Sequence, residues 1–79
     1  MDIDEFQKLD VAIIGLGLMG ASLAMALRGK CQHIIGIDLD ETVCSFALEN
    51  GMVDFAYSSI DNIISTADII ILATPIRAM

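Results

Sequence analysis

The chain has 79 residues, enough for one small domain, and 56% of them are hydrophobic, with a mean hydropathy of +0.72. This composition excludes an intrinsically disordered chain. Eleven acidic residues against four basic ones give a formal charge of -7, which argues against a nucleic-acid partner because phosphate backbones are held mainly by Lys and Arg.

The sequence favours a protein that is neither exported nor membrane-spanning. Between Val11 and Leu27 there are 17 residues without a charge, close to the length of a membrane-spanning helix. Three glycines fall in the first ten of these positions, and each costs about 1 kcal/mol in a helix interior. The acidic segment before the run has the wrong sign for a signal peptide, so we predict a cytoplasmic protein. Cys31 and Cys44 lack CxxC spacing and a His-rich neighbourhood, and we predict free thiols with no disulfide or metal site.

The first predicted strand spans residues 9–14. This run is short, β-branched at its centre and free of polar alternation, a pattern typical of a parallel strand that is covered on both faces. The mixed, acidic residues 1–8 before it are predicted to be a flexible lead-in.

A helix is predicted over residues 18–28, behind a glycine-rich turn. Ala, Leu and Met recur in it at helical spacing, and Arg28 followed by Gly29 is typical of a helix end. The residues expected to face the sheet are Leu16, Gly20, Leu23 and Leu27.

A second strand, predicted at residues 33–38, completes a βαβ unit. Parallel strands require a crossover of about a dozen residues, and this crossover is nearly always right-handed, which fixes the topology. A second helix is predicted over 41–50, with Asp40 as its N-cap and Gly51 as its end. A short third strand is predicted at 53–57. The residues expected to face inward from the second helix are Val43, Phe46 and Ala47.

The most strand-like run of the chain is residues 69–73, the fourth predicted strand. Before it, Ser59 is predicted to cap one or two helical turns that carry Ile60, Ile63 and Ile64. After it, Thr74 is a good N-cap and Pro75 a good first residue for a helix that continues over 76–79.

The run Gly15-Leu16-Gly17-Leu18-Met19-Gly20 has the spacing GxGxxG and lies between the first strand and the first helix, as in dinucleotide-binding loops. Gly15 is expected to allow the sharp turn, Gly17 to let the backbone approach a pyrophosphate, and Gly20 to let the helix pack closely on the strand. The helix directs free N–H groups and its positive dipole end at the anion.

Asp38 stands at the carboxyl end of the second predicted strand, 18 residues after Gly20. An acidic residue about 20 positions beyond the loop accepts hydrogen bonds from the adenosine ribose in dinucleotide-binding units. Its charge also repels a 2′-phosphate, and no Arg or Lys occurs in residues 39–41. We therefore predict NAD rather than NADP, although an Asp in isolation is also typical of a turn or an N-cap.

Ala73, Thr74 and Pro75, at the end of the fourth predicted strand, are further candidates for cofactor binding. Open α/β sheets bind ligands at this end of their strands, while Thr74-Pro75 is equally consistent with a simple strand end and helix start. Other polar residues favour structural or solvated positions. These are Ser22, which has no matched base, His33 at the opposite end of the sheet, and Arg77 in a first helical turn.

These features predict an α/β fold. Residues 1–79 are expected to form a three-layer, Rossmann-type half-domain, truncated at its carboxyl end, with a parallel sheet of strand order 3-2-1-4. Residues 69–73 are then expected to form a bare, apolar sheet edge that favours self-association.

Four segments resemble the amino-terminal half-domain of the prephenate dehydrogenases: VAIIGLGLMGASLA at 11–24, GID at 36–38, ALENGMVD at 47–54 and ADIIILATP at 67–75. The loop followed by Ser-Leu-Ala and the Asn-Gly-x-Val-Asp stretch are more specific than GxGxxG itself. The related β-hydroxyacid dehydrogenases share the loop but commonly have Asn-Arg after the second strand, where this chain has Asp38-Leu39-Asp40.

The resemblance implies an NAD-dependent oxidoreductase of tyrosine biosynthesis, which oxidatively decarboxylates prephenate to 4-hydroxyphenylpyruvate. The predicted cofactor-binding residues are Gly15, Leu16, Gly17, Leu18, Met19, Gly20, Asp38, Ala73, Thr74 and Pro75. The family's catalytic histidine, substrate-binding arginine and helical dimerisation domain would lie beyond Met79. The 79 residues alone are thus expected to be inactive. The full-length protein is expected to be a homodimer that acts on prephenate or arogenate.

Other functions stay open from the sequence. A different β-hydroxyacid-type NAD(P) dehydrogenase would share the loop, and a non-catalytic module that senses NAD would use both the loop and Asp38. An α/β domain that binds no nucleotide is the third alternative.

Overall fold

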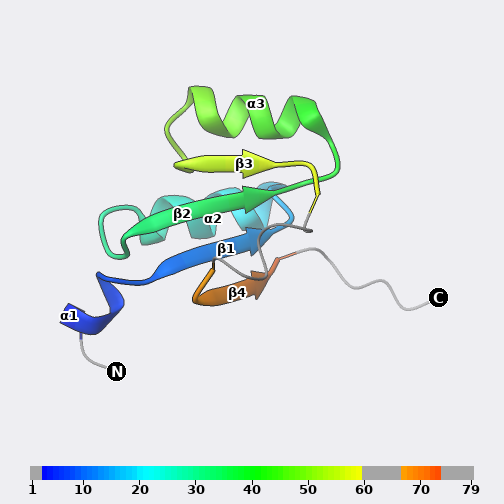
Figure 1. The fold of residues 1–79 in the computed structure, drawn as a ribbon. Helices are drawn as coiled ribbons and strands as arrows, with labels where there is room; N and C mark the ends of the chain where they lie inside the picture. Colours follow the sequence, from blue (N-terminus) through cyan, green and yellow to red (C-terminus); the bar gives the residue numbers. More distant parts are fainter. Residues whose placement is uncertain (1–2, 60–66, 74–79) are drawn as a thin grey trace.

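The computed structural model describes residues 3–59 and 67–73 and contains one parallel sheet with helices (Figure 1). The elements in chain order are α1 (Ile3–Phe6), β1 (Asp10–Ile14), α2 (Leu18–Leu27), β2 (His33–Ile37), α3 (Glu41–Glu49), β3 (Phe55–Tyr57) and β4 (Ile69–Leu72). The sheet has the order β3-β2-β1-β4, and every strand pair in it is parallel. The predicted α/β class and strand order are confirmed.

The strands end in step. Ile14 pairs with Ile37 on one side and with Leu72 on the other, and Ile37 in turn pairs with Tyr57. The residues that follow the four strands therefore form one edge of the sheet. They are Gly15, Asp38, Ser58 and Ala73.

The central strand β1 is buried on both faces, as its sequence predicts. Val11 and Ile13 pack in one cluster with residues of both α2 and α3, so these two helices cover the same face of the sheet. Ala12 is buried on the other face, where it packs with Ile35 and Ile37 of β2. The helical turns predicted to follow Ser59 fall within residues 60–66, which lie outside the described residues.

The helix ends are where the sequence predicts them. The Asp40 carboxylate caps α3 by accepting a hydrogen bond from the Thr42 N–H at 2.9 Å. Gly29 and Gly51 follow α2 and α3 with φ values of 81° and 66°, which an L side chain rarely adopts. The predicted inward face of α2 is also confirmed. Leu16 and Gly20 are buried and Leu23 and Leu27 pack on the core, together with the fully buried Ala24.

One prediction for α3 is wrong: Phe46 does not face the core. Its side chain is 56% exposed, whereas Cys44 and Ala47 are buried and Val43 is partly buried. The inward stripe of α3 therefore runs through residues 43, 44 and 47, and Phe46 lies about 100° around the helix from Ala47.

The expected lead-in contains a helical turn. The Leu9 N–H donates to the Phe6 carbonyl at 3.0 Å, and the Phe6 ring packs against the core. The flexibility of residues 1–8 stays a prediction. Helices of the described ranges are all too short or too polar to cross a bilayer, and the predicted helix after Thr74 lies outside those ranges.

Candidate functional site

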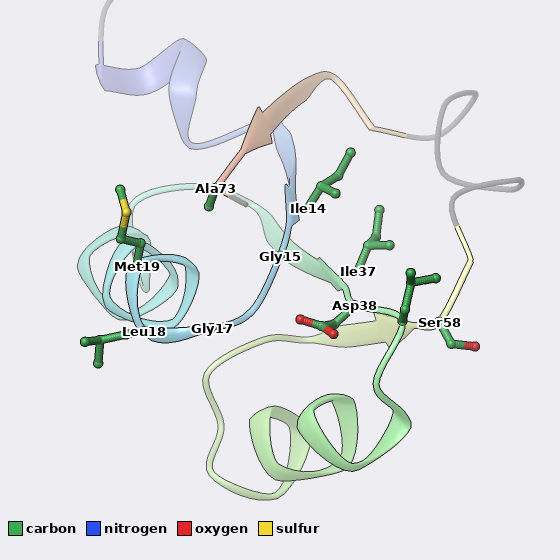
Figure 2. Close-up of a pocket in the computed structure, with 10 residues that line it drawn as sticks. Ile14, Gly15, Gly17, Leu18, Met19, Ile37, Asp38, Ser58 and Ala73 are labelled. Atoms are coloured by element: carbon green, nitrogen blue, oxygen red, sulfur yellow. The ribbon is translucent and has the colours of Figure 1, made fainter. Parts of the chain in front are cut away.

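A cavity of about 550 Å³ opens at the carboxyl edge of the sheet (Figure 2), which is a typical size for a small-molecule site. It is lined by Ile14, Gly15, Gly17, Leu18, Met19, Ile37, Asp38, Leu39, Ser58 and Ala73. The cavity lies at the end of β1. In the sheet, β2 and β3 lie on one side of β1 and β4 lies on the other, so the strand order reverses at β1. Open α/β sheets bind their ligands at such a switch point.

The glycine loop turns sharply at Gly15, which has a φ of 96°. The Gly15 N–H donates to the Ile37 carbonyl at 2.7 Å, so the turn starts while the chain is still bound to β2. A Cβ atom at Gly20 would overlap the Gly15 carbonyl oxygen. The first and third glycines therefore do what their positions in the motif predict: one makes the turn, and the other lets α2 pack on it.

Gly17 is the N-cap of α2 and has no side chain to cap the helix. A Cβ atom at this position would meet nothing within 4 Å, so the backbone here faces open space. The Ala21 N–H makes the first backbone hydrogen bond of the helix, to the Gly17 carbonyl at 2.9 Å. The N–H groups of Leu18, Met19 and Gly20 precede that bond and have no acceptor within the helix.

Leu16 is not among the residues that line this cavity. Its side chain is buried and packs against β2 at Gly36, where an added Cβ would lie 2.6 Å from a Leu16 methyl carbon. Gly36 was missed as a site-supporting residue, although a glycine inside a strand is itself a signal of close approach by another group.

Asp38 connects two segments of backbone. One carboxylate oxygen, Oδ2, accepts a hydrogen bond from the Leu16 N–H at 2.9 Å, and Oδ1 accepts one from the Asp40 N–H at 2.9 Å. Figure 2 shows the carboxylate between the end of β2 and the loop around Gly15 and Gly17. The predicted position of Asp38 at the strand end, beside the glycine loop, is confirmed.

The thiol of Cys44 supports the strand ends from the side of α3. Its sulfur lies 3.4 Å from the Asp38 carbonyl oxygen and 3.5 Å from that of Tyr57, to which it donates. Burial raises the pKa of this thiol most, and the carboxylates of Asp38, Asp40 and Glu41 raise it further, against a lowering by the backbone of Asp38. The net effect keeps the thiol protonated as a donor. Cys31 and Cys44 are both free.

The cavity has little charge of its own. Among its described lining residues, Asp38 alone carries a titratable side chain, and none is Lys or Arg. Arg28 pairs with Asp54 at 3.0 Å, and the His33 Nδ1 lies 2.8 Å from an Asp10 oxygen. Because His33 and Asp10 open their strands, this pair lies at the opposite end of the sheet, where the sequence places it. Within the described part of the chain, a bound anion at this cavity would therefore interact with backbone N–H groups rather than with cationic side chains.

Sequence reasoning missed some of the lining residues and left others untested. Ile14, Ile37, Leu39 and Ser58 line the cavity although they were not predicted. All four stand within two residues of a strand's carboxyl end, and this position was the signal that could have found them. Thr74, Pro75 and Arg77 lie outside the described residues.

Comparisons with known proteins point to one family. Residues 23–79, more than two thirds of the chain, match the family model described as prephenate dehydrogenase, nucleotide-binding domain. The chain is 36% identical over 72 residues to a prephenate dehydrogenase from Bacillus subtilis, which covers 89% of the chain and 19% of that protein. It is 35% identical over 71 residues to a cyclohexadienyl dehydrogenase from Zymomonas mobilis, with 87% of the chain and 24% of that protein covered.

A solved structure of a prephenate dehydrogenase agrees with this relationship. The chain resembles a prephenate dehydrogenase from A. aeolicus, crystallised with hydroxyphenyl propionate and NAD+, with a TM-score of 0.78, 33% identity, and 85% of this chain and 24% of that one covered. A myo-inositol 2-dehydrogenase from Lactobacillus plantarum matches with a TM-score of 0.70 and 27% identity over 86% of this chain and 22% of its own. The chain thus spans about a fifth to a quarter of the length of its curated relatives.

Proposed function

The chain belongs to the family of prephenate dehydrogenase nucleotide-binding domains, and on this premise we propose that it binds NAD as the cofactor-binding part of an oxidoreductase acting on prephenate or arogenate. The observation that carries the proposal is the meeting of the glycine loop and Asp38 at one cavity. The relative crystallised with NAD+ supports the same cofactor.

The backbone around Gly17 would hold the pyrophosphate. The N–H groups at the start of α2 have no acceptor within the helix, and Gly17 leaves open space where a side chain would stand. A helix N-terminus binds phosphate through such groups and through its dipole. This arrangement needs no Lys or Arg, in keeping with the acidic chain and with the lining residues described above.

Asp38 would hold the adenosine ribose. Its carboxylate borders the cavity and can accept hydrogen bonds from ribose hydroxyls. The exposed side chain of Leu39 beside it offers apolar surface to the adenine ring. Ala73, and with it Thr74 and Pro75, would border the nicotinamide side, because they follow the strand on the other side of β1.

The preference for NAD over NADP follows from charge. A 2′-phosphate would approach the carboxylate of Asp38, and the described lining residues contain no basic group to bind it. Burying an unpaired phosphate beside a carboxylate is unfavourable because like charges repel at short distance.

Bound NAD would accept a hydride from the substrate; the residues of this chain contribute binding and orientation. The catalytic base, the substrate clamp and the dimer contacts are proposed to lie in sequence beyond Met79, and the 79 residues are proposed to be inactive alone. Titration calorimetry with NAD and NADP tests the cofactor: we expect NAD to bind, and NADP to bind at least about tenfold more weakly. Binding of neither refutes the proposal, tighter binding of NADP refutes the role of Asp38, and prephenate-dependent NADH formation by the chain alone refutes its inactivity.

A further inference from the structure

Asp38 is bound to the glycine loop before any ligand is considered. Its Oδ2 accepts the Leu16 N–H across 22 positions of sequence, and its Oδ1 accepts the Asp40 N–H at the start of α3. A carboxylate whose only role was to bind a ribose would need neither contact. The side chain therefore already bridges the glycine loop and the N-cap residue of α3.

We propose that Asp38 is a positioning residue for the glycine loop, in addition to the ribose-binding role on which this inference partly rests. Removing its carboxylate would then weaken the binding of a pyrophosphate even when the ligand has no ribose hydroxyls. The residue that binds the ribose would then also hold the loop that binds the pyrophosphate.

The loop depends on this contact because glycines flank the residue that makes it. Gly15 and Gly17 on either side of Leu16 have more conformational freedom than other residues. Two consecutive N–H groups tie the turn to the end of β2: that of Gly15 to the Ile37 carbonyl at 2.7 Å, and that of Leu16 to the Asp38 carboxylate at 2.9 Å. The second tie is the one that a side-chain substitution can remove.

The packing of Leu16 makes the loss of this tie costly. The Leu16 side chain is buried against Gly36 and Val53, so its backbone cannot turn outward to find water without leaving the core. A part-buried N–H without an acceptor is unfavourable. The loop would have to shift, and with it the start of α2 that faces the cavity.

Both roles fit on one carboxylate. An ionised Asp offers about four acceptor positions on its two oxygens, and the two backbone N–H groups occupy one on each oxygen. One position on each oxygen remains for a ribose hydroxyl. Asn in this place keeps one carbonyl oxygen and turns an NH₂ group toward the other N–H, so it satisfies one tie, and Ala satisfies none.

The test separates ribose binding from loop positioning by comparing a ligand that has ribose hydroxyls with one that lacks them. The affinities of ADP and of 2′,3′-dideoxy-ADP are measured by calorimetry for the wild type, for Asp38→Ala and Asp38→Asn, and for Asp40→Asn. Asp40→Asn removes a neighbouring charge but keeps the oxygen that caps α3, which makes it the matched control. Circular dichroism establishes that each variant is folded at the temperature used.

We expect Asp38→Ala to weaken the binding of 2′,3′-dideoxy-ADP by about tenfold, because a hydrogen bond to a charged acceptor is lost. The binding of ADP should weaken by more. The affinity of Asp38→Asn for the dideoxy ligand should fall between those of Asp38→Ala and the wild type. The affinity of Asp40→Asn should stay within about twofold of the wild-type value. Unchanged affinity of Asp38→Ala for the dideoxy ligand, with weaker binding of ADP, would overturn the positioning role and leave the ribose role intact.

Amide hydrogen exchange provides a readout that needs no ligand. In Asp38→Ala the Leu16 amide should exchange at least about tenfold faster, while the amide of Ile13 in the core keeps its protection. Slow exchange at Leu16 in that variant would overturn the inference. If the wild type binds neither ADP nor its dideoxy analogue, the proposed function fails, and the exchange of Leu16 alone decides whether Asp38 positions the loop.

Discussion

Replacing Gly20 with Ala should destabilise the fold although alanine is the better helix former. The added Cβ would overlap the carbonyl oxygen of Gly15, which is backbone and is itself held in a turn with a φ of 96°. Neither atom belongs to a flexible side chain, so α2 must move away from β1. The move would open the packing of the buried Ala24 against the sheet.

The magnitude follows from two opposing terms. Alanine in place of a helical glycine gains about 1 kcal/mol from propensity. Overpacking of a tight contact costs typically 1–3 kcal/mol, and more where backbone must shift. Because the clash here is between backbone atoms, we expect the upper end of that range to apply and a net loss of about 2 kcal/mol. Urea unfolding followed by circular dichroism measures it as a lower midpoint at an unchanged slope.

Gly17→Ala is the matched control for this experiment. Its Cβ would meet nothing within 4 Å and its φ of -66° suits alanine, so stability should change by less than about 1 kcal/mol, since the loss of a glycine N-cap and the gain from a stiffer unfolded chain oppose each other. NAD binding should weaken, because the methyl group would occupy the space proposed for the pyrophosphate. A Gly20→Ala variant as stable as Gly17→Ala would refute the assignment of the third glycine to helix packing.

Three further predictions concern the core and the open edge. Gly36→Ala should cost about 1 kcal/mol in urea unfolding, less than Gly20→Ala, because its Cβ would lie 2.6 Å from a methyl carbon at the end of the Leu16 side chain, which can shift where backbone cannot; a loss as large as that of Gly20→Ala would contradict this reasoning. Burial raises the pKa of the Cys44 thiol, so its contribution to stability is complete below the unfolded thiol's pKa of about 8.5 and is lost as the pH rises through the folded value. The stability of the wild type should therefore fall more steeply than that of Cys44→Ala between pH 8 and pH 10.5, a range chosen around that value, and parallel curves would count against it. Finally, β4 is a sheet edge with Leu72 63% exposed, so the chain should self-associate in sedimentation experiments and Leu72→Lys should reduce this; a stable wild-type monomer at high concentration would argue against it.

The order of the elements could be read from the sequence because each one carries a local signal. The glycines at 29 and 51 and the cap at Asp40 stand where chain direction must change. The apolar runs without alternation identify β1 and β2, which are buried on both faces. With the right-handed crossover rule, these signals leave one strand order, and the structure has it.

The details that the sequence did not predict depend on distances between elements. Nothing local to Phe46 distinguishes an inward from an outward position, because that depends on which side of α3 packs against the sheet. Ser58 has no motif of its own and reaches the cavity only because β3 ends in step with β2. The hydrogen bond from Leu16 to Asp38 likewise joins residues whose proximity is set by the register of β1 and β2.

The two connections of Asp38 bear on how the cofactor preference of this site could change. A site that accepts a 2′-phosphate has to lose the carboxylate, since its charge repels that group. Here the same carboxylate also holds the Leu16 N–H beside the turn at Gly15. A replacement that removes the charge but offers no acceptor would thus admit the 2′-phosphate while loosening the backbone that binds the pyrophosphate. A change of preference at Asp38 therefore requires a neutral residue that still accepts a hydrogen bond, together with a basic residue nearby, and Leu39 in the cavity wall is the described position that suits the latter.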